Sequence, residues 1–107
     1  MDAFNKLSLA QVERLALLSE ELGEAQQAIG KILRHGYDST NPDIASGTDN
    51  REDLCKEMGH VVAALSFLST RGDIQMYTVR TYESEKMESV ARYLHHQNID
   101  NLKIEGE

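Results

Sequence analysis

The fold of this chain is decided by residues 9–35, which read LAQVERLALLSEELGEAQQAIGKILRH. Apolar side chains recur here at intervals of three and four residues, as they do along one face of an α-helix. This stripe consists of Val12, Leu15, Leu18, Leu22, Ile29 and Leu33. Ser8 is a favourable N-cap and Gly36 is a favourable C-terminal stop. The segment therefore predicts one long helix from about Leu9 to His35.

A second amphipathic helix is predicted after the polar loop of residues 37–50, which contains the chain's single proline. Asn50 is a good N-cap, and the helix extends from there to about Arg71, before Gly72. Its stripe consists of Leu54, Met58, Val61, Leu65 and Leu68.

A third helix is predicted from about Ile74 to Gln97, with Asp73 as its cap. Its stripe consists of Met76, Val79, Met87, Val90 and Leu94. Residues 98–107 are predicted to form a loosely packed tail. No strand pattern and no repeat appears in the sequence. We therefore expect an all-α fold, an antiparallel helical bundle of three long helices in a single domain of residues 1–107.

The composition is that of an ordinary globular domain, with 107 residues, 40% apolar residues and 27% charged residues. The formal net charge of −7, without a basic stripe, predicts no nucleic-acid polymer as a partner. No apolar run is long enough to cross a bilayer, so no membrane association is expected. Cys55 is the only cysteine, and the chain starts without a signal-peptide pattern, so we expect a cytoplasmic protein.

Two acidic motifs contain the candidate metal ligands. Residues 20–24 read EELGE and residues 57–60 read EMGH. Within each motif, two polar side chains stand three residues apart and share one helical face. Two such faces brought together would form a set of ligands for a divalent metal that binds polyphosphate. Since bare carboxylates repel phosphate, a phosphorylated substrate would need that metal.

A solvated helix face is the alternative for the acidic residues, and a helix–helix contact is the alternative for His60. Three glutamates within five positions repel one another, however, which favours a bound counter-ion. Gly23 and Gly59 lie in mid-helix, where each costs about 1 kcal/mol relative to alanine. We interpret these glycines as signs that another backbone or a ligand approaches closely.

The wheel of the first helix predicts a covered acidic face. Leu17 and Ala28 lie on the same side as Glu21 and Glu24, away from the main stripe. Three helices of these lengths would also leave much apolar surface uncovered in a monomer. We therefore expect a homodimer or a homotetramer, with the acidic cleft near the subunit junction.

Three segments resemble the MazG-like all-α nucleoside triphosphate pyrophosphohydrolases, especially the small phage-type members. They are residues 19–25 (SEELGEA), residues 50–60 (NREDLCKEMGH) and residues 85–97 (EKMESVARYLHHQ). The resemblance extends from about Leu9 to Gln97. It implies a helical dimer or tetramer that cleaves a nucleoside triphosphate to the monophosphate and pyrophosphate. It also implies the cytoplasm of a bacterium or of a phage-infected host.

The resemblance also implies roles for individual residues. By position, the catalytic acids are Glu20, Glu21, Glu24 and Glu57. The last three of these match the metal-binding acids of the family, and Glu20 acts behind them or on the attacking water. His60 falls where the fourth metal ligand, an aspartate, usually lies. Lys86 falls where the family places a phosphate-contacting lysine.

His60 leaves the metal open between Mg²⁺ and Mn²⁺. Mg²⁺ prefers oxygen ligands, whereas imidazole suits Mn²⁺ and softer ions better. The site either uses such an ion, or gains a carboxylate from Asp53, or binds nucleotide without turning it over. As a further alternative, His60 accepts the proton of the attacking water.

Two other interpretations stay open. Glu57 and His60 have the Glu-x-x-His spacing of ferritin-like carboxylate metal bundles, which require a second such motif from a partner copy. Lys86 is either a phosphate ligand or a solvated surface lysine, and Glu83 either pairs with Lys86 or acts as an additional ligand.

Overall fold

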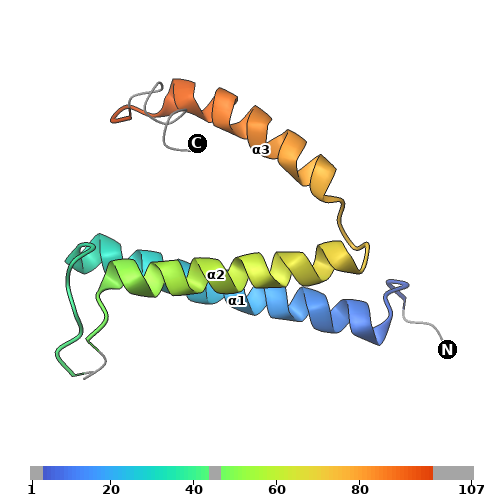
Figure 1. Cartoon of the computed structure of the whole chain (residues 1–107), viewed down its shortest axis with the longest axis horizontal. Helices are drawn as coiled ribbons and strands as arrows, with labels where there is room; N and C mark the ends of the chain where they lie inside the picture. The colour runs from blue at the N-terminus through green and yellow to red at the C-terminus, as the bar shows by residue number, and fades with distance from the viewer. Residues whose placement is uncertain (1–3, 44–46, 98–107) are drawn as a thin grey trace. The chain divides into compact units, whose positions relative to one another are not determined.

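The computed structural model describes residues 4–43 and 47–97, and its regular structure is helical (Figure 1). The elements are α1 (Leu9–His35), α2 (Asn50–Thr70), α3 (Met76–Val90) and the short 3-10 helix η1 (Ala91–Tyr93). No strand occurs in these residues, where Thr40 and Asp49 form an isolated antiparallel bridge. The prediction of an all-α fold is confirmed. The chain divides into two compact units, residues 1–73 and residues 74–107.

These helices do not have the properties of membrane spans. Within residues 4–43 and 47–97, none of them combines the length and the apolar composition that a bilayer span requires.

The ends of α1 are set by local capping. The Ser8 hydroxyl accepts a hydrogen bond from the Gln11 amide at 3.1 Å, and the Gln11 side chain accepts one from the Ser8 amide at 2.8 Å. This capping box satisfies two amides that the first turn leaves unpaired. At the other end, Gly36 has a φ of 85° and donates its amide to the Ile32 carbonyl. The predicted bounds of the first helix are confirmed.

The start of α2 differs from the prediction. Its N-cap is Asp49, whose carboxylate accepts a hydrogen bond from the Glu52 amide at 2.8 Å. Asn50 is instead buried, and its side chain donates to the Gly36 carbonyl at 3.0 Å. The assignment of Asn50 as the cap was wrong, because this residue joins the end of α1 to the start of α2.

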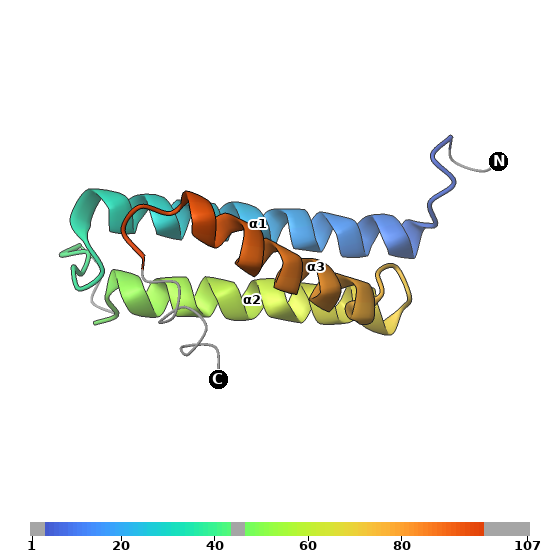
Figure 2. The same cartoon turned by 90° about the horizontal axis from the view of Figure 1, so that it is seen from above.

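Helices α1 and α2 lie side by side and antiparallel (Figures 1 and 2). The buried apolar residues of this unit are Ala25, Ala28, Ala64 and Leu68. Three of these four are alanines, and small side chains at a helix contact allow a short distance between the axes. The acidic face of α1 is therefore covered by α2 of the same chain.

The apolar stripe predicted for the first helix does not make this contact. Val12, Leu15, Leu22 and Ile29 are each between 42% and 51% exposed, and Leu33 is 82% exposed. The alanine face that packs on α2 lies about a quarter turn away around the helix. The periodicity identified the helix but indicated the wrong face as the core, and it leaves an exposed apolar surface on α1.

The third helix is shorter than predicted. It ends at Val90 instead of Gln97, and the chain tightens into η1 before it becomes extended at Leu94 (φ −91°, ψ 128°). In the last turn of α3, the Ser89 hydroxyl donates to the Lys86 carbonyl at 3.3 Å. Such a side-chain bond competes weakly with the regular backbone ladder. The predicted tail, residues 98–107, lies outside the described residues.

Asp73 does not cap α3, because it is bound to Arg14. The Arg14 Nε and Nη2 atoms donate to the Asp73 Oδ2 and Oδ1 atoms at 2.6 and 3.0 Å. The N-cap of α3 is Gln75, without a side-chain cap bond. The two paired side chains are only 19% and 11% exposed. A bidentate, mostly buried pair of this kind fixes the segment after α2 to the first half of α1.

The Arg14–Asp73 pair predicts an acid-sensitive contribution to stability. The hydrogen bond from Arg14 lowers the pKa of the Asp73 carboxyl below its usual value. A lowered pKa in the folded state means that the contribution is complete above the unfolded-state pKa of about 3.9. It is lost as the pH falls through the folded-state pKa. Urea unfolding of the wild type and of Asp73→Asn should therefore differ most near neutral pH, and the difference should shrink toward pH 2.

Asp38→Asn is the matched control, because Asp38 forms an exposed ion pair with Arg51 at 3.3 Å and its side chain is 83% exposed. Exposed pairs contribute about 0–1 kcal/mol. An Asp73→Asn effect that is constant from pH 7 to pH 2 would contradict the assignment.

Candidate metal centre

Four side chains from the two packed helices meet at one place. Glu21 and Glu24 come from α1, and Glu57 and His60 come from α2. Each offers one ligand atom, and these four atoms all lie within 4.8 Å of one another. Spacings of three residues place each pair on one helical face, and the α1–α2 contact turns the two faces toward each other.

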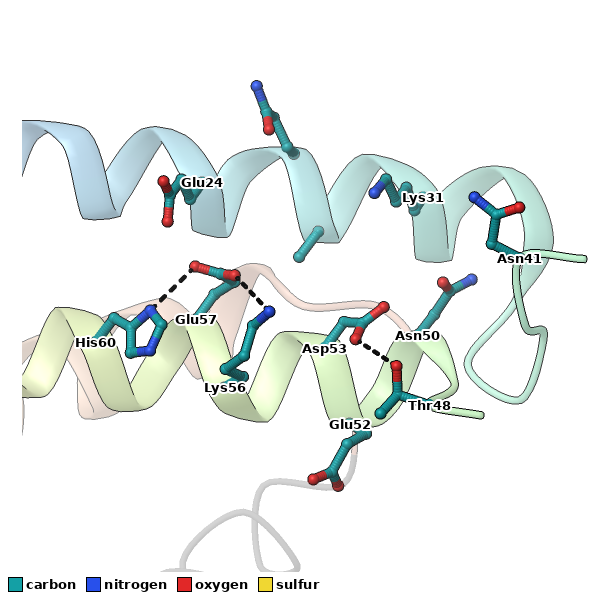
Figure 3. A pocket seen from close by; sticks show the side chains of 12 residues that line it. Glu24, Lys31, Asn41, Thr48, Asn50, Glu52, Asp53, Lys56, Glu57 and His60 are labelled. Carbon is teal, nitrogen blue, oxygen red and sulfur yellow. Dashed lines mark hydrogen bonds and ion pairs between the residues drawn. The ribbon is translucent and has the colours of Figure 1, made fainter. Parts of the chain in front are cut away.

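His60 lies at the edge of this group. Its Nδ1 atom is 3.4 Å from Glu21 Oε2 and 3.5 Å from Glu57 Oε2. Figure 3 shows the second of these contacts, between His60 and Glu57. Its side chain is 49% exposed, whereas the side chains of Glu21 and Glu57 are 15% and 13% exposed. The two glutamates therefore form the interior of the site and the imidazole forms its outer side.

Two carboxylate oxygens of the site lack a hydrogen-bond partner. Glu21 Oε2 and Glu57 Oε2 are shielded from solvent, and neither accepts a hydrogen bond from the residues that the structure describes. A buried polar atom without a partner costs about 1–3 kcal/mol, and more when it is charged. The nearest basic atom to both oxygens is His60 Nδ1, at 3.4 and 3.5 Å. A divalent cation would bind both oxygens directly, so the residues fit a metal.

The crowding of the carboxylates also changes the protonation of Glu24. The pKa of its carboxyl is raised, first by a hydrogen bond with Glu57, then by the negative charge of Glu21 and by burial. The charges of Glu57 and Glu20 add to the shift. The raised pKa shows that the neighbouring negative charges and burial destabilise the ionised form of Glu24.

The other acids proposed for the site lie around it. Glu20 is exposed and outside the group of four, although its charge acts on Glu24. Asp53 is half-buried and accepts a hydrogen bond from the Thr48 hydroxyl at 3.1 Å. It lines the same pocket but is not one of the four clustered ligands. The substitution of Asp53 for the missing carboxylate thus stays a prediction.

Lys86 lies on α3, in the second unit of the chain. Glu83 does not pair with Lys86 there, because Glu83 Oε1 is 3.2 Å from Arg80 Nη1. The phosphate-binding role of Lys86 stays a prediction.

The mid-helix glycines do not mark a close approach within the chain. A Cβ atom built on Gly23 or on Gly59 would meet no atom within 4 Å among the described residues. The expected close approach is therefore not made by a backbone among the described residues, and close approach by a ligand stays a prediction.

A pocket of about 690 Å³ opens beside the cluster (Figure 3). Glu24, Glu57 and His60 line one part of it. Its other lining residues are Gln27, Ala28, Lys31, Asn41, Thr48, Asn50, Glu52, Asp53 and Lys56. This volume lies within the range of about 300–1,000 Å³ that is typical of small-molecule sites.

The sequence did not reveal that the loop residue Asn41 and the lysines Lys31 and Lys56 line this pocket. The loop returns toward α2 through a hydrogen bond from the Asn50 amide to the Ser39 carbonyl, and this return brings Asn41 to the pocket wall. Lys31 and Lys56 resemble solvated helix lysines in the sequence. The one available signal was that Lys31 follows Glu24 by seven residues, which is two helical turns on the same face.

Comparison with protein-family models, with curated proteins and with solved structures gave no match.

The repulsion within the cluster predicts that a charge-removing substitution stabilises the metal-free protein. Glu57→Gln removes one negative charge and supplies an amide donor to the remaining carboxylates. We expect an increase of about 1 kcal/mol in the free energy of unfolding, or about 4–8 °C in Tm for a domain of this size. Thermal melts with a chelator, followed by circular dichroism, measure the change.

The same variant should lose the response to metal. Binding to the folded state at 100 times Kd stabilises a protein by about 2.7 kcal/mol, so Mn²⁺ should raise the Tm of the wild type but not that of Glu57→Gln. Glu13→Gln, an exposed glutamate on α1 outside the cluster, is the control and should respond like the wild type. A Glu57→Gln protein that is less stable without metal, and equally stabilised by Mn²⁺, would contradict the assignment.

Proposed function

We propose that this chain is a metal-dependent nucleoside triphosphate pyrophosphohydrolase of the MazG-like type, which cleaves a nucleoside triphosphate to the monophosphate and pyrophosphate. The observation that carries the proposal is the meeting of Glu21, Glu24, Glu57 and His60 within 4.8 Å, beside a pocket of nucleotide-compatible size. The pattern of the acids along the chain, which resembles the MazG-like family, supports the same reaction.

The donor set supports Mg²⁺ or Mn²⁺ as the cofactor. Three carboxylates supply hard oxygen ligands, and one imidazole favours Mn²⁺ over Mg²⁺. When bound, such an ion neutralises phosphate oxygens and activates water for attack on phosphorus. Asp53 lines the same pocket and is available to a second ion or to a bound water.

The remaining roles in the proposed reaction belong to residues of the chain. Glu21, Glu24 and Glu57 hold the cation between α1 and α2 and thereby fix the position of the phosphate chain. Glu20, on the exposed side of the cluster, orients the attacking water. Lys86 contacts the leaving pyrophosphate.

The apolar surface of α1 supports a homodimer or a homotetramer as the working form. Leu15, Leu22 and Ile29 are 42%, 51% and 44% exposed on one stripe of α1. An uncovered apolar stripe of this kind is typical of a surface that packs against another helix. The proposed enzyme acts on free nucleotides in the cytoplasm, not on nucleic-acid polymers.

Release of pyrophosphate tests the proposal directly. The wild type, with Mg²⁺ or Mn²⁺, should release pyrophosphate from at least one member of a panel of ribo- and deoxyribonucleoside triphosphates. Glu57→Gln should lower kcat/KM more than about 100-fold, since even the outer hydrogen-bond partners of a metal site contribute about 10–100-fold. Glu13→Gln should leave the rate unchanged. Pyrophosphate release that survives in Glu57→Gln would overturn the assignment.

The second candidate is a nucleotide-binding protein with a weakened site on the same scaffold. His60 favours it, because a neutral imidazole brings no negative charge where the family pattern has aspartate. A ferritin-like site has less support, because the four clustered ligands contain a single Glu-x-x-His motif.

His60→Asp separates the enzyme from the weakened form. If His60 is a working ligand, the variant should raise the ratio of Mg²⁺-supported to Mn²⁺-supported rate by about tenfold, because it replaces a nitrogen ligand with a charged oxygen ligand. A wild type that is inactive with both metals and a His60→Asp variant that turns over would establish the weakened form instead.

A further inference from the structure

Two lysines share the pocket with the acidic cluster, one from each helix. Lys31 projects from α1 and Lys56 from α2, and both line the pocket that Glu24, Glu57 and His60 border (Figure 3). The fold therefore places cationic side chains from both helices along the same pocket as its anionic ones.

Lys56 lies closer to the cluster than Lys31 does. Lys56 Nζ is 3.7 Å from Glu57 Oε1, so its ammonium group adjoins the site itself. Lys31 follows Glu24 by seven residues, which corresponds to about 10 Å along the helix axis. A phosphate chain that starts at the cluster would thus meet Lys56 first and Lys31 next.

Lys31 shares the pocket with the acids Glu52 and Asp53 but is not paired with either of them. Among residues 4–43 and 47–97, no carboxylate forms an ion pair with Lys31, whereas Lys56 is paired with Glu57. The pocket also continues past Lys31. An adjoining cavity of about 270 Å³ is lined by Lys31, Arg34 and His35, and shares Asn41, Asn50 and Asp53 with the first. Basic side chains thus continue from the clustered ligands into the adjoining cavity, which Asp53 also lines.

We infer that Lys31 and Lys56 bind the phosphate groups that extend beyond the metal ligands, so that the pocket selects polyphosphates over single phosphates. The inference rests on the proposed function and assigns the substrate's phosphate chain a direction, from the cluster toward the C-terminal end of α1. A cation at the cluster neutralises the nearest phosphate, and an ammonium group is the remaining partner for the next one. Lysine suits this task because its flexible stem follows a chain of anions as a point charge.

Inorganic phosphates test this inference without any contribution from a base. We would measure binding of tripolyphosphate, pyrophosphate and orthophosphate by isothermal titration calorimetry at saturating Mn²⁺. The wild type should bind tripolyphosphate most tightly and orthophosphate least tightly. Lys31→Met should weaken tripolyphosphate binding about tenfold or more, because a charge-assisted hydrogen bond is lost. It should leave orthophosphate binding unchanged, and Lys56→Met should weaken pyrophosphate and tripolyphosphate alike.

Two further variants control for charge and for folding. Lys31→Arg keeps the positive charge and should keep the preference for tripolyphosphate. Lys6→Met removes an exposed lysine of the same unit outside the pocket and should bind all three phosphates like the wild type. Lys31 is exposed on α1, so its replacement by methionine should leave the melting curve intact.

The outcomes separate this inference from the proposed function. If Lys31→Met and Lys56→Met bind tripolyphosphate like the wild type, the lysines are solvated surface groups and the inference is wrong, even where the wild type releases pyrophosphate from nucleotides. A wild type without any preference for tripolyphosphate would also overturn it. A wild type that releases no pyrophosphate overturns the proposed function, whatever the lysine variants bind.

Discussion

The rest of the structure depends on the confinement of three carboxylates between two packed helices. Glu21, Glu24 and Glu57 lie where a helix contact normally places apolar side chains, and an oxygen of Glu21 and one of Glu57 are shielded from solvent and accept no hydrogen bond from the described residues. Like charges in such a place repel one another and lose their hydration. A fold that keeps this arrangement must hold α1 and α2 together by contacts made elsewhere along the pair.

Those contacts lie on both sides of the cluster. Toward one end of the pair, the Asn50 side chain joins the end of α1 to the start of α2, and toward the other the bidentate Arg14–Asp73 pair joins α1 to the segment after α2. Between them, buried alanines keep the two helices close. The four clustered side chains are thereby held in place without a cation. For the proposed metal site, preorganisation of this kind would lower the free energy that binding must spend on ordering side chains.

The sequence was sufficient where the determining interactions are local. The helical periodicity, the Ser8 N-cap and the Gly36 stop predicted the first helix, and the three-residue spacings placed each pair of clustered side chains on one face. The sequence was insufficient where the structure depends on contacts between residues that are far apart in the chain. Nothing near Asp73 indicates that Arg14 will bind it. Local amphipathicity likewise chose the larger side chains of α1 as the core, whereas the alanines at the acidic face make the contact because small residues permit close approach.

Within the cluster, the His60 side chain is 49% exposed, whereas those of Glu21 and Glu57 are 15% and 13% exposed. Its position matters for the chemistry, because an exposed imidazole can rotate away without disturbing the packing of α1 on α2. Glu21 and Glu57 have no such freedom in the interior. In the proposed enzyme, a histidine in place of the family's aspartate would alter the charge and the metal preference at the outer side of the site, while the carboxylates of Glu21 and Glu57 would still hold the cation. This asymmetry favours a retuned metal site over a lost one.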